Sequence, residues 1–250
     1  MWYVVVALAV IIFLWARSKL VNLLPYINQF LTRYCNDPAV LNPKDFEWTI
    51  NFRANWQVIR DEYLNYARSN PIPVYKTINE MTSSCDLTGG WRTLFLRIFG
   101  KDTDHTQHFP QTMHLINACP CTLAFFSVFE PGTKLTRHVG LYKGVLRYHL
   151  PLIIPDKWDK CFINVNGRVL NWRFDSEDDP IDLMFDDTFL HHAENNTDQK
   201  RVILFLDIKR DFGSWWLNAI NSVLLRFIKS NDALNDTVKR ANRLTHRECQ

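Results

Sequence analysis

Cys161-Phe-Ile-Asn-Val-Asn-Gly-Arg-Val-Leu-Asn-Trp-Arg-Phe174 is the stretch of sequence that decides the fold. Two short apolar segments, residues 161–165 and 168–174, flank the pair Asn166-Gly167. An Asn-Gly pair adopts the positive φ angles of a two-residue turn at little cost, so it joins antiparallel strands. The stretch therefore predicts a β-hairpin.

Short apolar segments of the same kind continue on both sides of this hairpin. They lie at residues 123–129, 145–154, 182–186 and 201–208. Turn-forming pairs separate them, at residues 131–132, 155–156 and 195–196. Many short strands without helices between them predict a mainly β domain, an antiparallel sandwich or barrel such as a jelly roll.

Helices are expected on either side of this β region. Apolar residues recur at spacings of three and four from Trp56 to Tyr66, which predicts a helix over residues 55–69. Residues 91–99 follow Gly89-Gly90 and favour a further strand. Residues 214–229 predict an amphipathic helix that packs on the sheet or, as the alternative, lies in a membrane interface.

The N-terminus is apolar enough to predict a membrane helix over residues 1–24. Residues 2–16 carry no charge, and Arg17 and Lys19 follow them. A helix over the uncharged run spans about 22 Å, short of a hydrocarbon core of roughly 30 Å. It reaches further if Arg17 and Lys19 extend their charges to the membrane surface. Positive charges after the run predict a single-pass protein in which the rest of the chain faces the cytoplasm.

Length and charge limit the remaining possibilities. With 250 residues, the chain has room for a linker over 25–45, one domain over 46–212, and an amphipathic helix with a basic tail over 213–250. A net charge of +3 is too small to indicate nucleic-acid binding. Six cysteines in this length indicate buried thiols in a reducing compartment rather than a disulfide framework.

Candidate chemistry rests on two histidines and an arginine in the β region. Standard hydrolase, zinc-protease and nucleotide-binding motifs are missing from the sequence. His138 follows a Pro-Gly turn, His191 lies fifty-three residues later in Phe185-Asp-Asp-Thr-Phe-Leu-His-His192, and Arg201 begins an apolar strand. Imidazoles ligate metals, and a guanidinium can hold a carboxylate by two hydrogen bonds. Each of these residues taken alone is a weak signal.

Together they resemble the aspartyl/asparaginyl β-hydroxylases, members of the 2-oxoglutarate oxygenase superfamily. The matching blocks are Ser127-Val-Phe-Glu-Pro-Gly-Thr133, Arg137-His-Val-Gly140, Leu146-Arg-Tyr-His-Leu150, Phe185-Asp-Asp-Thr-Phe-Leu-His191 and Arg201-Val-Ile-Leu-Phe-Leu-Asp207. Trp91, after Gly89-Gly90, resembles an upstream Gly-Trp element of the family. The resemblance implies a double-stranded β-helix of the jelly-roll or cupin type and an Fe(II)-dependent dioxygenase that uses 2-oxoglutarate and O2.

Position by position, the resemblance also implies the roles of individual residues. His138 and His191 would ligate Fe(II). Arg201 and Ser127 would hold the distal carboxylate of 2-oxoglutarate, and Arg147 and His149 would contact the end next to the metal. Trp91 would belong to the same cosubstrate site, and Arg201 would be essential for catalysis together with the two histidines.

The sequence departs from the wider superfamily at position 140. A carboxylate usually stands two residues after the first histidine and completes a triad of ligands. Here His138 is followed by Val139 and Gly140, as the resemblance to the aspartyl/asparaginyl hydroxylases leads us to expect. Asp186 and Asp187 are expected to be turn residues or to support the ligands, and His192 is expected to face outward, away from His191.

The resemblance leaves two substrate classes open. Gly140 favours the branch that hydroxylates Asp or Asn side chains of proteins, which we place first. The blocks around Arg147 and residues 193–205 favour the branch of membrane-associated lipid A hydroxylases, which oxidise an acyl chain. A barrel that binds a small acid without turnover is the alternative outside enzymes.

Overall fold

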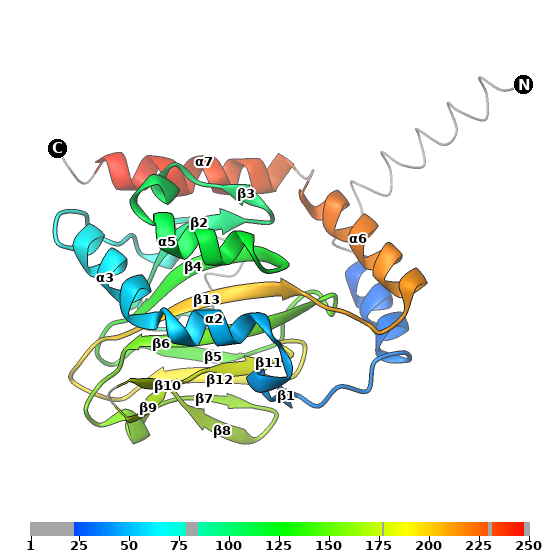
Figure 1. Ribbon diagram of the computed structural model, residues 1–250, viewed down its shortest axis with the longest axis horizontal. Helices are drawn as coiled ribbons and strands as arrows, with labels where there is room; N and C mark the ends of the chain where they lie inside the picture. Colours follow the sequence, from blue (N-terminus) through cyan, green and yellow to red (C-terminus); the bar gives the residue numbers. More distant parts are fainter. Residues whose placement is uncertain (1–22, 79–84, 177, 230–231, 248–250) are drawn as a thin grey trace, which may run out of the picture.

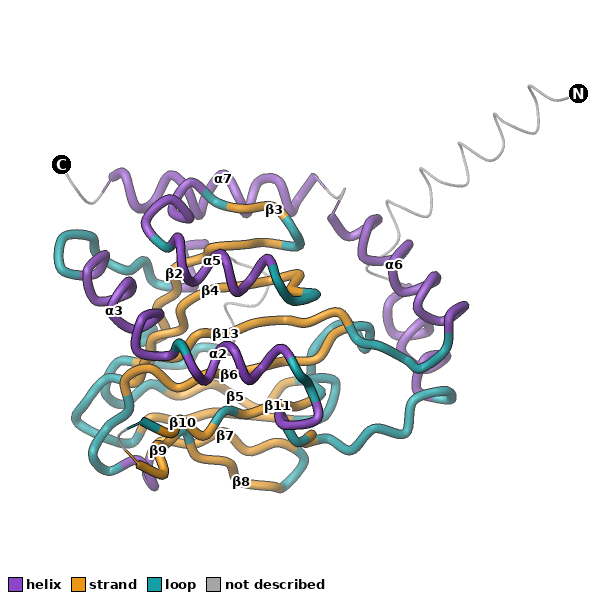
Figure 2. Tube along the Cα trace, in the orientation of Figure 1, coloured by secondary structure: helices purple, strands orange, loops and turns teal. Residues whose placement is uncertain are grey.

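The computed structural model describes residues 23–78, 85–176, 178–229 and 232–247. Two antiparallel sheets dominate this part of the chain, and helices cover the larger sheet (Figure 1). The prediction of a mainly β domain with flanking helices is therefore confirmed. Figure 2 shows the strands gathered at the centre and the helices around them.

The larger sheet has the strand order β1-β11-β6-β13-β4-β2-β3 and the smaller sheet the order β5-β12-β7-β8. The strands of the larger sheet are β1 (Val40–Leu41), β2 (Trp91–Ile98), β3 (Lys101–Asp102), β4 (Cys121–Phe129), β6 (Val145–Ile153), β11 (Leu183–Phe185) and β13 (Arg201–Lys209). Those of the smaller sheet are β5 (Lys134–His138), β7 (Cys161–Val165), β8 (Arg168–Asn171) and β12 (His191–Asn195). The chain crosses between the two sheets from β4 to β5, β6 and β7, and again from β11 to β12 and β13, as in a jelly roll.

The hairpin around Asn166-Gly167 forms as the sequence predicts, with one difference. Asn166 and Gly167 adopt φ angles of 50° and 85°, and β7 pairs with β8 across them. The strand expected over 168–174 is interrupted at Trp172, after which β9 (Arg173–Ser176) pairs with β10 (Asp179–Ile181) in a separate ribbon. Trp172 leaves the ladder because its side chain is fully buried between the two main sheets.

Both faces of the larger sheet are buried. In β13, Val202 and Leu204 belong to the apolar cluster under the helices, while Ile203 and Phe205 belong to the cluster between the sheets. Successive residues of a strand point to opposite faces, so such a strand needs apolar residues at every position. This explains the continuous apolar run after Arg201.

Helices pack on the outer face of the larger sheet. They are α2 (Trp48–Ala54), α3 (Trp56–Ala67) and α5 (Pro110–Asn117), accompanied by the 3-10 turns η1 (Pro43–Asp45) and η3 (Asp104–His108). Phe52, Ile59 and Tyr63 bury their side chains against sheet residues such as Phe126 and Tyr148. This confirms the helix predicted around Trp56, and α4 (Tyr75–Ile78) and η4 (Trp158–Lys160) complete the middle of the chain.

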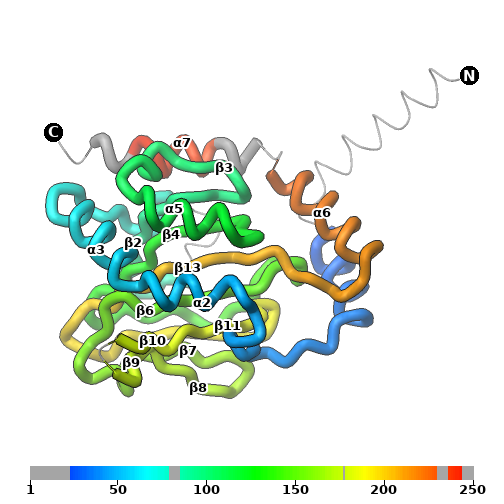
Figure 3. Tube along the Cα trace, viewed as in Figure 1, coloured from blue at the N-terminus to red at the C-terminus, as the bar shows by residue number. Residues whose placement is uncertain are grey.

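The two ends of the described chain differ from their expected forms. The segment 25–45 contains a helix over residues 23–32 and strand β1, because Leu31 is fully buried and Val40 pairs with Phe185. The basic C-terminal residues form α7 (Asp232–Arg247) rather than a plain tail, and its Ala241 is buried in the inter-sheet cluster. Figure 3 follows these ends by colour, from blue to red.

Helix α6 (Trp215–Lys229) lies beside the helix over residues 23–32 (Figure 1). Leu24, Leu31 and Leu217 share an apolar cluster with Tyr142 and Val145. The predicted amphipathic helix over 214–229 is thus present and packs against the domain. The membrane helix predicted over 1–24 lies outside the described residues except for its last two positions, and none of the described helices is long and apolar enough to cross a bilayer.

Candidate functional site

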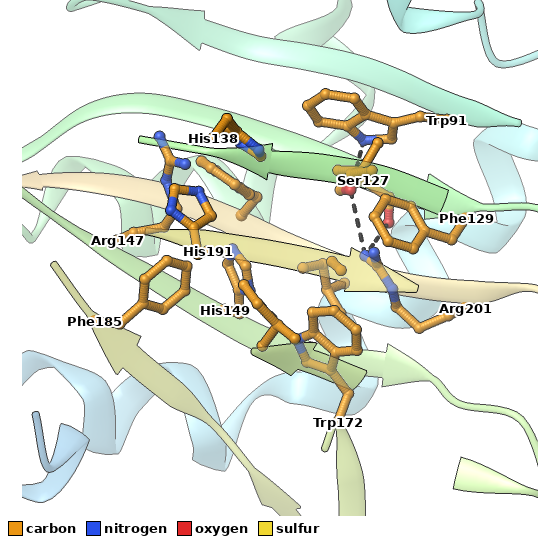
Figure 4. Close-up of a pocket in the computed structure, with 15 residues that line it drawn as sticks. Trp91, Ser127, Phe129, His138, Arg147, His149, Trp172, Phe185, His191 and Arg201 are labelled. Carbon is orange, nitrogen blue, oxygen red and sulfur yellow. Dashed lines mark hydrogen bonds between the residues drawn. The ribbon is translucent and has the colours of Figure 1, made fainter. Parts of the chain in front are cut away.

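A pocket between the two sheets contains every site residue that the sequence predicts. It has about 390 Å³ of empty space, its open mouth included. Its walls include Trp91, Ser127, His138, Arg147, His149, His191 and Arg201. In Figure 4, His138 and His191 lie at one end of the pocket and Arg201 at the other, with His149 between them.

His138 and His191 are opposite one another on neighbouring strands. Cα pairing in the smaller sheet places His138 of β5 against His191 of β12, and their ring centroids are 4.2 Å apart. Nδ1 of His138 lies 2.7 Å from the carbonyl oxygen of Thr136, and Nδ1 of His191 lies 2.8 Å from that of Phe189. A carbonyl oxygen only accepts, so each Nδ1 carries the proton and each Nε2 keeps a free lone pair.

Burial keeps both rings neutral. Burial, together with a smaller effect of the nearby Arg147 guanidinium, lowers the pKa of His191 to about 3. Burial also lowers the pKa of His138. A neutral imidazole is the form that ligates a metal. His192, the next residue along β12, is only half-buried and lies against Phe162, as expected of the opposite face.

Arg201 is a buried cation without an acidic partner. Its side chain is 1% exposed, and its guanidinium carbon lies 3.6 Å from the ring centroid of Phe129 and 4.2 Å from that of Trp172. Nη1 donates to the carbonyl oxygen and the hydroxyl of Ser127, at 3.2 and 3.3 Å. Among the described residues it has no ion pair with a carboxylate, and its Nε has no hydrogen bond. Burial lowers the pKa of Arg201 to about 10, although the neighbouring Cys161 thiol opposes this shift.

Such a site favours an anion, because an unpaired buried charge is costly and a carboxylate would offset that cost. The aromatic rings on both sides of Arg201 fix the plane of its guanidinium. Ser127 is fixed in turn, since the indole nitrogen of Trp91 donates to its hydroxyl at 3.0 Å. The end of the pocket at Arg201 is therefore suited to a carboxylate group.

His149 has the opposite tautomer from the other two histidines. The indole nitrogen of Trp172 lies 3.3 Å from Nδ1 of His149, and an indole N–H can only donate. Nδ1 therefore accepts, and the ring proton is on Nε2, which is buried without a partner among the described residues. Burial holds the pKa of His149 well below its usual value. His149 thus offers a neutral N–H donor to a ligand in the pocket.

Arg147 lines the pocket but is already paired. Its Nη2 lies 2.7 Å from a carboxylate oxygen of Asp187, and its Nε lies 3.1 Å from Asp207. Burial raises the pKa of Asp187 to about 6 despite this pairing. Asp187 also occupies the space next to Gly140, where a Cβ atom would come within 2.0 Å of its Oδ2. The contacts of Arg147 with the cosubstrate stay a prediction.

The donor set fits a metal with two protein ligands. Nε2 of His191 is buried without a hydrogen-bond partner, which is the state expected of a ligand nitrogen. No group of three or more His, Cys, Asp and Glu side chains with the arrangement of a metal site occurs in the part of the chain that the structure describes. A metal bound here would hold two imidazoles and keep its other positions for small ligands, a set that suits Fe(II).

Sequence reasoning missed Phe129 and Trp172, which enclose the Arg201 guanidinium. Phe129 ends a predicted strand, and no local pattern separates a core aromatic from one that covers a cation. Trp172 stands where the expected strand is interrupted. Trp172 contacts Arg201 because of how the two sheets are arranged. The residues next to Trp172 in the sequence therefore do not predict that contact.

Comparison with known proteins agrees with this site. Residues 53–211 match the family described as aspartyl/asparaginyl beta-hydroxylase. The chain is 34% identical over 181 residues to the ornithine lipid ester-linked acyl 2-hydroxylase of Rhizobium tropici, an alignment that covers 71% of this chain and 63% of that protein. It is 27% identical over 168 residues to human aspartyl/asparaginyl beta-hydroxylase, which covers 63% of this chain and 20% of the human protein.

Among solved structures, a prolyl-4-hydroxylase from Pseudomonas putida is similar with a TM-score of 0.40 and 13% identity, over 62% of this chain and 88% of that one. The family match covers more than half of this chain, from α2 to the end of the jelly roll, and includes both histidines and Arg201. The resemblance predicted from the sequence is therefore confirmed, and the chain belongs to the aspartyl/asparaginyl beta-hydroxylase family.

Proposed function

We propose that this protein is a non-haem Fe(II) hydroxylase that uses 2-oxoglutarate and O2. The observation that carries the proposal is the pairing of two ligand-ready imidazoles with an unpaired, buried guanidinium in one pocket. His138 and His191 would hold the metal, and Arg201 with Ser127 would bind the distal carboxylate of 2-oxoglutarate. When bound, Fe(II) would activate O2, which is the oxidant, and 2-oxoglutarate would supply two electrons as it is oxidised to succinate and CO2 while one oxygen atom enters a C–H bond.

The protein's own residues would bind and orient these groups. Nε2–H of His149 would donate to an oxygen of 2-oxoglutarate near the metal, and Trp172 would keep that proton on Nε2. Phe129 and Trp172 would exclude water from the carboxylate at Arg201. Arg147, with Asp187 and Asp207, would set the charge next to the metal ligands.

The acceptor is an Asp or Asn side chain of a protein in the main form of this proposal. Its support is Gly140 and the similarity to the human aspartyl/asparaginyl beta-hydroxylase. A lipid acyl chain is the second candidate, favoured by the 34% identity to the rhizobial lipid hydroxylase. A single-pass membrane protein with a cytoplasmic catalytic domain, anchored by residues 1–24, remains part of the proposal, and its support is the uncharged run 2–16.

Succinate formation tests the function directly. The full chain, supplied with Fe(II), 2-oxoglutarate and O2, should release succinate, and His138→Ala should reduce that release at least about a hundredfold, as expected for loss of a metal ligand. His114→Ala is the matched control, because His114 is exposed on α5 and should leave the rate unchanged. Equal rates in wild type and His138→Ala would exclude the proposed enzyme and favour a barrel that only binds small acids.

A further inference from the structure

Helix α6 exposes apolar side chains to solvent along its outer face. Trp215 is 84% exposed, Ile220 37% and Val223 48%. Positions 215, 219, 223 and 226 are spaced by four, four and three residues, so they form one stripe on the helix surface. The buried Leu217 is on the opposite side and packs with Leu24 and Leu31. A helix packed on a domain normally presents polar residues outward, whereas Arg226 is the only polar residue of this stripe.

The helix over residues 23–32 extends this surface. Tyr26 is 71% exposed and Tyr34, just beyond the helix, is 51% exposed. The ring centroids of Phe30 and Tyr34 lie 6.4 and 5.3 Å from that of Trp216 of α6. The two helices lie side by side (Figures 1 and 2), and these ring contacts join their apolar residues into one patch. We call this patch the aromatic face, and it consists of Tyr26, Phe30, Tyr34, Trp215, Ile220 and Val223.

The two helices that carry the aromatic face bear only positive charges, while the exposed Asp211 stands just before α6 and accepts from Asn218. Residues 23–34 and 215–229 contain no Asp or Glu, and their charged residues are Arg33, Arg226 and Lys229, all exposed. Exposed Trp and Tyr rings next to Arg and Lys suit the boundary between lipid headgroups and acyl chains. The uncharged run 2–16 joins the chain ahead of the helix that carries Tyr26 and Phe30.

A short loop connects the aromatic face with the pocket. His138 is followed by Val139 and Leu141, whose side chains are 53% and 56% exposed. The amide of Asn28 donates to the carbonyl oxygen of Leu141 at 2.9 Å, and the backbone N–H of Lys143 donates back to Asn28 at 2.9 Å. The loop after His138 is thus fixed to the helix over 23–32 and adds two exposed apolar residues between that helix and the pocket.

We propose that the aromatic face docks onto a bilayer containing anionic lipid and presents a lipid acyl chain to the pocket past Val139 and Leu141. This inference rests on the proposed hydroxylase function and, within it, favours the second candidate acceptor, a lipid acyl chain, over a protein side chain. A water-soluble protein partner would not require exposed aromatic residues and basic residues to coincide on the same two helices.

Quenching by brominated lipid tests the docking without turnover. The full chain is reconstituted in vesicles of phosphatidylcholine and phosphatidylglycerol with brominated acyl chains, which quench tryptophans that reach into the bilayer. Trp215→Phe should remove part of the quenching seen in wild type. Trp158→Phe is the matched control, since Trp158 is 39% exposed on η4 and should leave the quenching unchanged. Trp215 is nearly fully exposed, so its replacement leaves the packing intact.

Turnover then tests the acceptor. The variant Trp215→Ser/Val223→Ser should raise the KM for an acyl substrate held in the bilayer about tenfold, as expected for losing the burial of apolar side chains, with the KM for 2-oxoglutarate unchanged.

Bromolipid quenching that Trp215→Phe does not alter would overturn the docking, as would self-association that shields Trp215 in detergent. Oxygen transfer to a peptide but not to lipid would overturn the lipid acceptor. Quenching without succinate formation would refute the hydroxylase and leave the docking face standing.

Discussion

Three imidazoles line one pocket, and local hydrogen bonds give them two different proton positions. Carbonyl oxygens hold the proton of His138 and His191 on Nδ1, while the indole of Trp172 holds that of His149 on Nε2. The first two rings therefore present lone pairs and the third presents a donor. The proton positions of His138 and His191 are set by carbonyl oxygens two residues earlier in the chain. That of His149 is set by Trp172, which is 23 residues away.

Metal affinity should depend on which of two adjacent histidines is replaced. His191→Ala should weaken Mn(II) or Fe(II) binding by at least about tenfold, because one of two protein nitrogens is lost. His192→Ala should change it little, since His192 lies on the other face of β12 against Phe162. A titration followed by the paramagnetic resonance of free Mn(II) measures both variants, and an equal loss in both would contradict the assignment.

The metal-free protein should lose stability on acidification through His191. Its pKa is about 3 in the folded state against roughly 6.5 when unfolded, so the unfolded state binds more protons between these values. Stability contributed by the neutral ring is then complete above about pH 6.5 and falls as pH decreases. Relative to His191→Asn, wild type should lose roughly 1–3 kcal/mol between pH 7 and 4, measured by denaturant unfolding. A difference that stays constant with pH would refute it.

Neighbouring strands of the smaller sheet are connected through Gly140 and Asp187. The backbone N–H of Gly140 donates to the carbonyl oxygen of Asp187 at 2.7 Å, and the Asp187 side chain occupies the space beside Gly140. In the usual triad a carboxylate side chain stands at position 140. Here the Asp187 carboxylate, from the loop before β12, fills the space beside Gly140 instead. That carboxylate is paired with Arg147.

Substitutions at these two positions should therefore be coupled. Gly140→Ala should destabilise the protein by about 1–3 kcal/mol, because the new methyl group displaces the Asp187 carboxylate. In the Asp187→Ala background the same change should cost less, since the space is then free. A double-mutant cycle from denaturant unfolding gives the coupling, and additive costs would show that Asp187 does not fill this position.

The elements that the sequence predicts well are those whose pattern is local. The strands β4, β6, β7 and β13 follow apolar runs bounded by turns, and α3 follows helical spacing. Strands β5 and β12 escape this reasoning, because they contain Lys134, Arg137, His191 and Glu194 among few apolar residues. These two segments become strands because β12 pairs with β5 on one side and with β7 on the other. Such pairing joins residues far apart in sequence, so no local pattern predicts it.

The candidate site was predictable only where family motifs mark it. His138, His191 and Arg201 lie far apart in sequence, and the resemblance brought them together before the structure did. The pairing of Arg147 with two carboxylates and the cover of Arg201 by Phe129 and Trp172 involve residues from several strands. No single segment carries such information, so these contacts required the structure.

At the scale of the whole molecule, the free energy of unfolding should increase when 2-oxoglutarate binds, because its carboxylate would pair with the buried charge of Arg201. With Mn(II) present, 2-oxoglutarate at a hundred times its Kd should stabilise the fold by about 2.7 kcal/mol, or roughly 5–10 °C in Tm. Arg201→Met should abolish the gain from 2-oxoglutarate while keeping metal binding. Scanning calorimetry measures both, and an equal gain in the variant would exclude Arg201 as the carboxylate site.

The register of β5 and β12 has a consequence for how this protein could be monitored. His138 and His191 face each other on a single rung of the ladder, and a slip by one residue would put His192 in place of His191 and separate the ligand pair. Metal binding by both histidines therefore requires the native register of β5 and β12. Metal uptake during refolding would time the moment when the smaller sheet acquires its native alignment, independently of any catalytic assay.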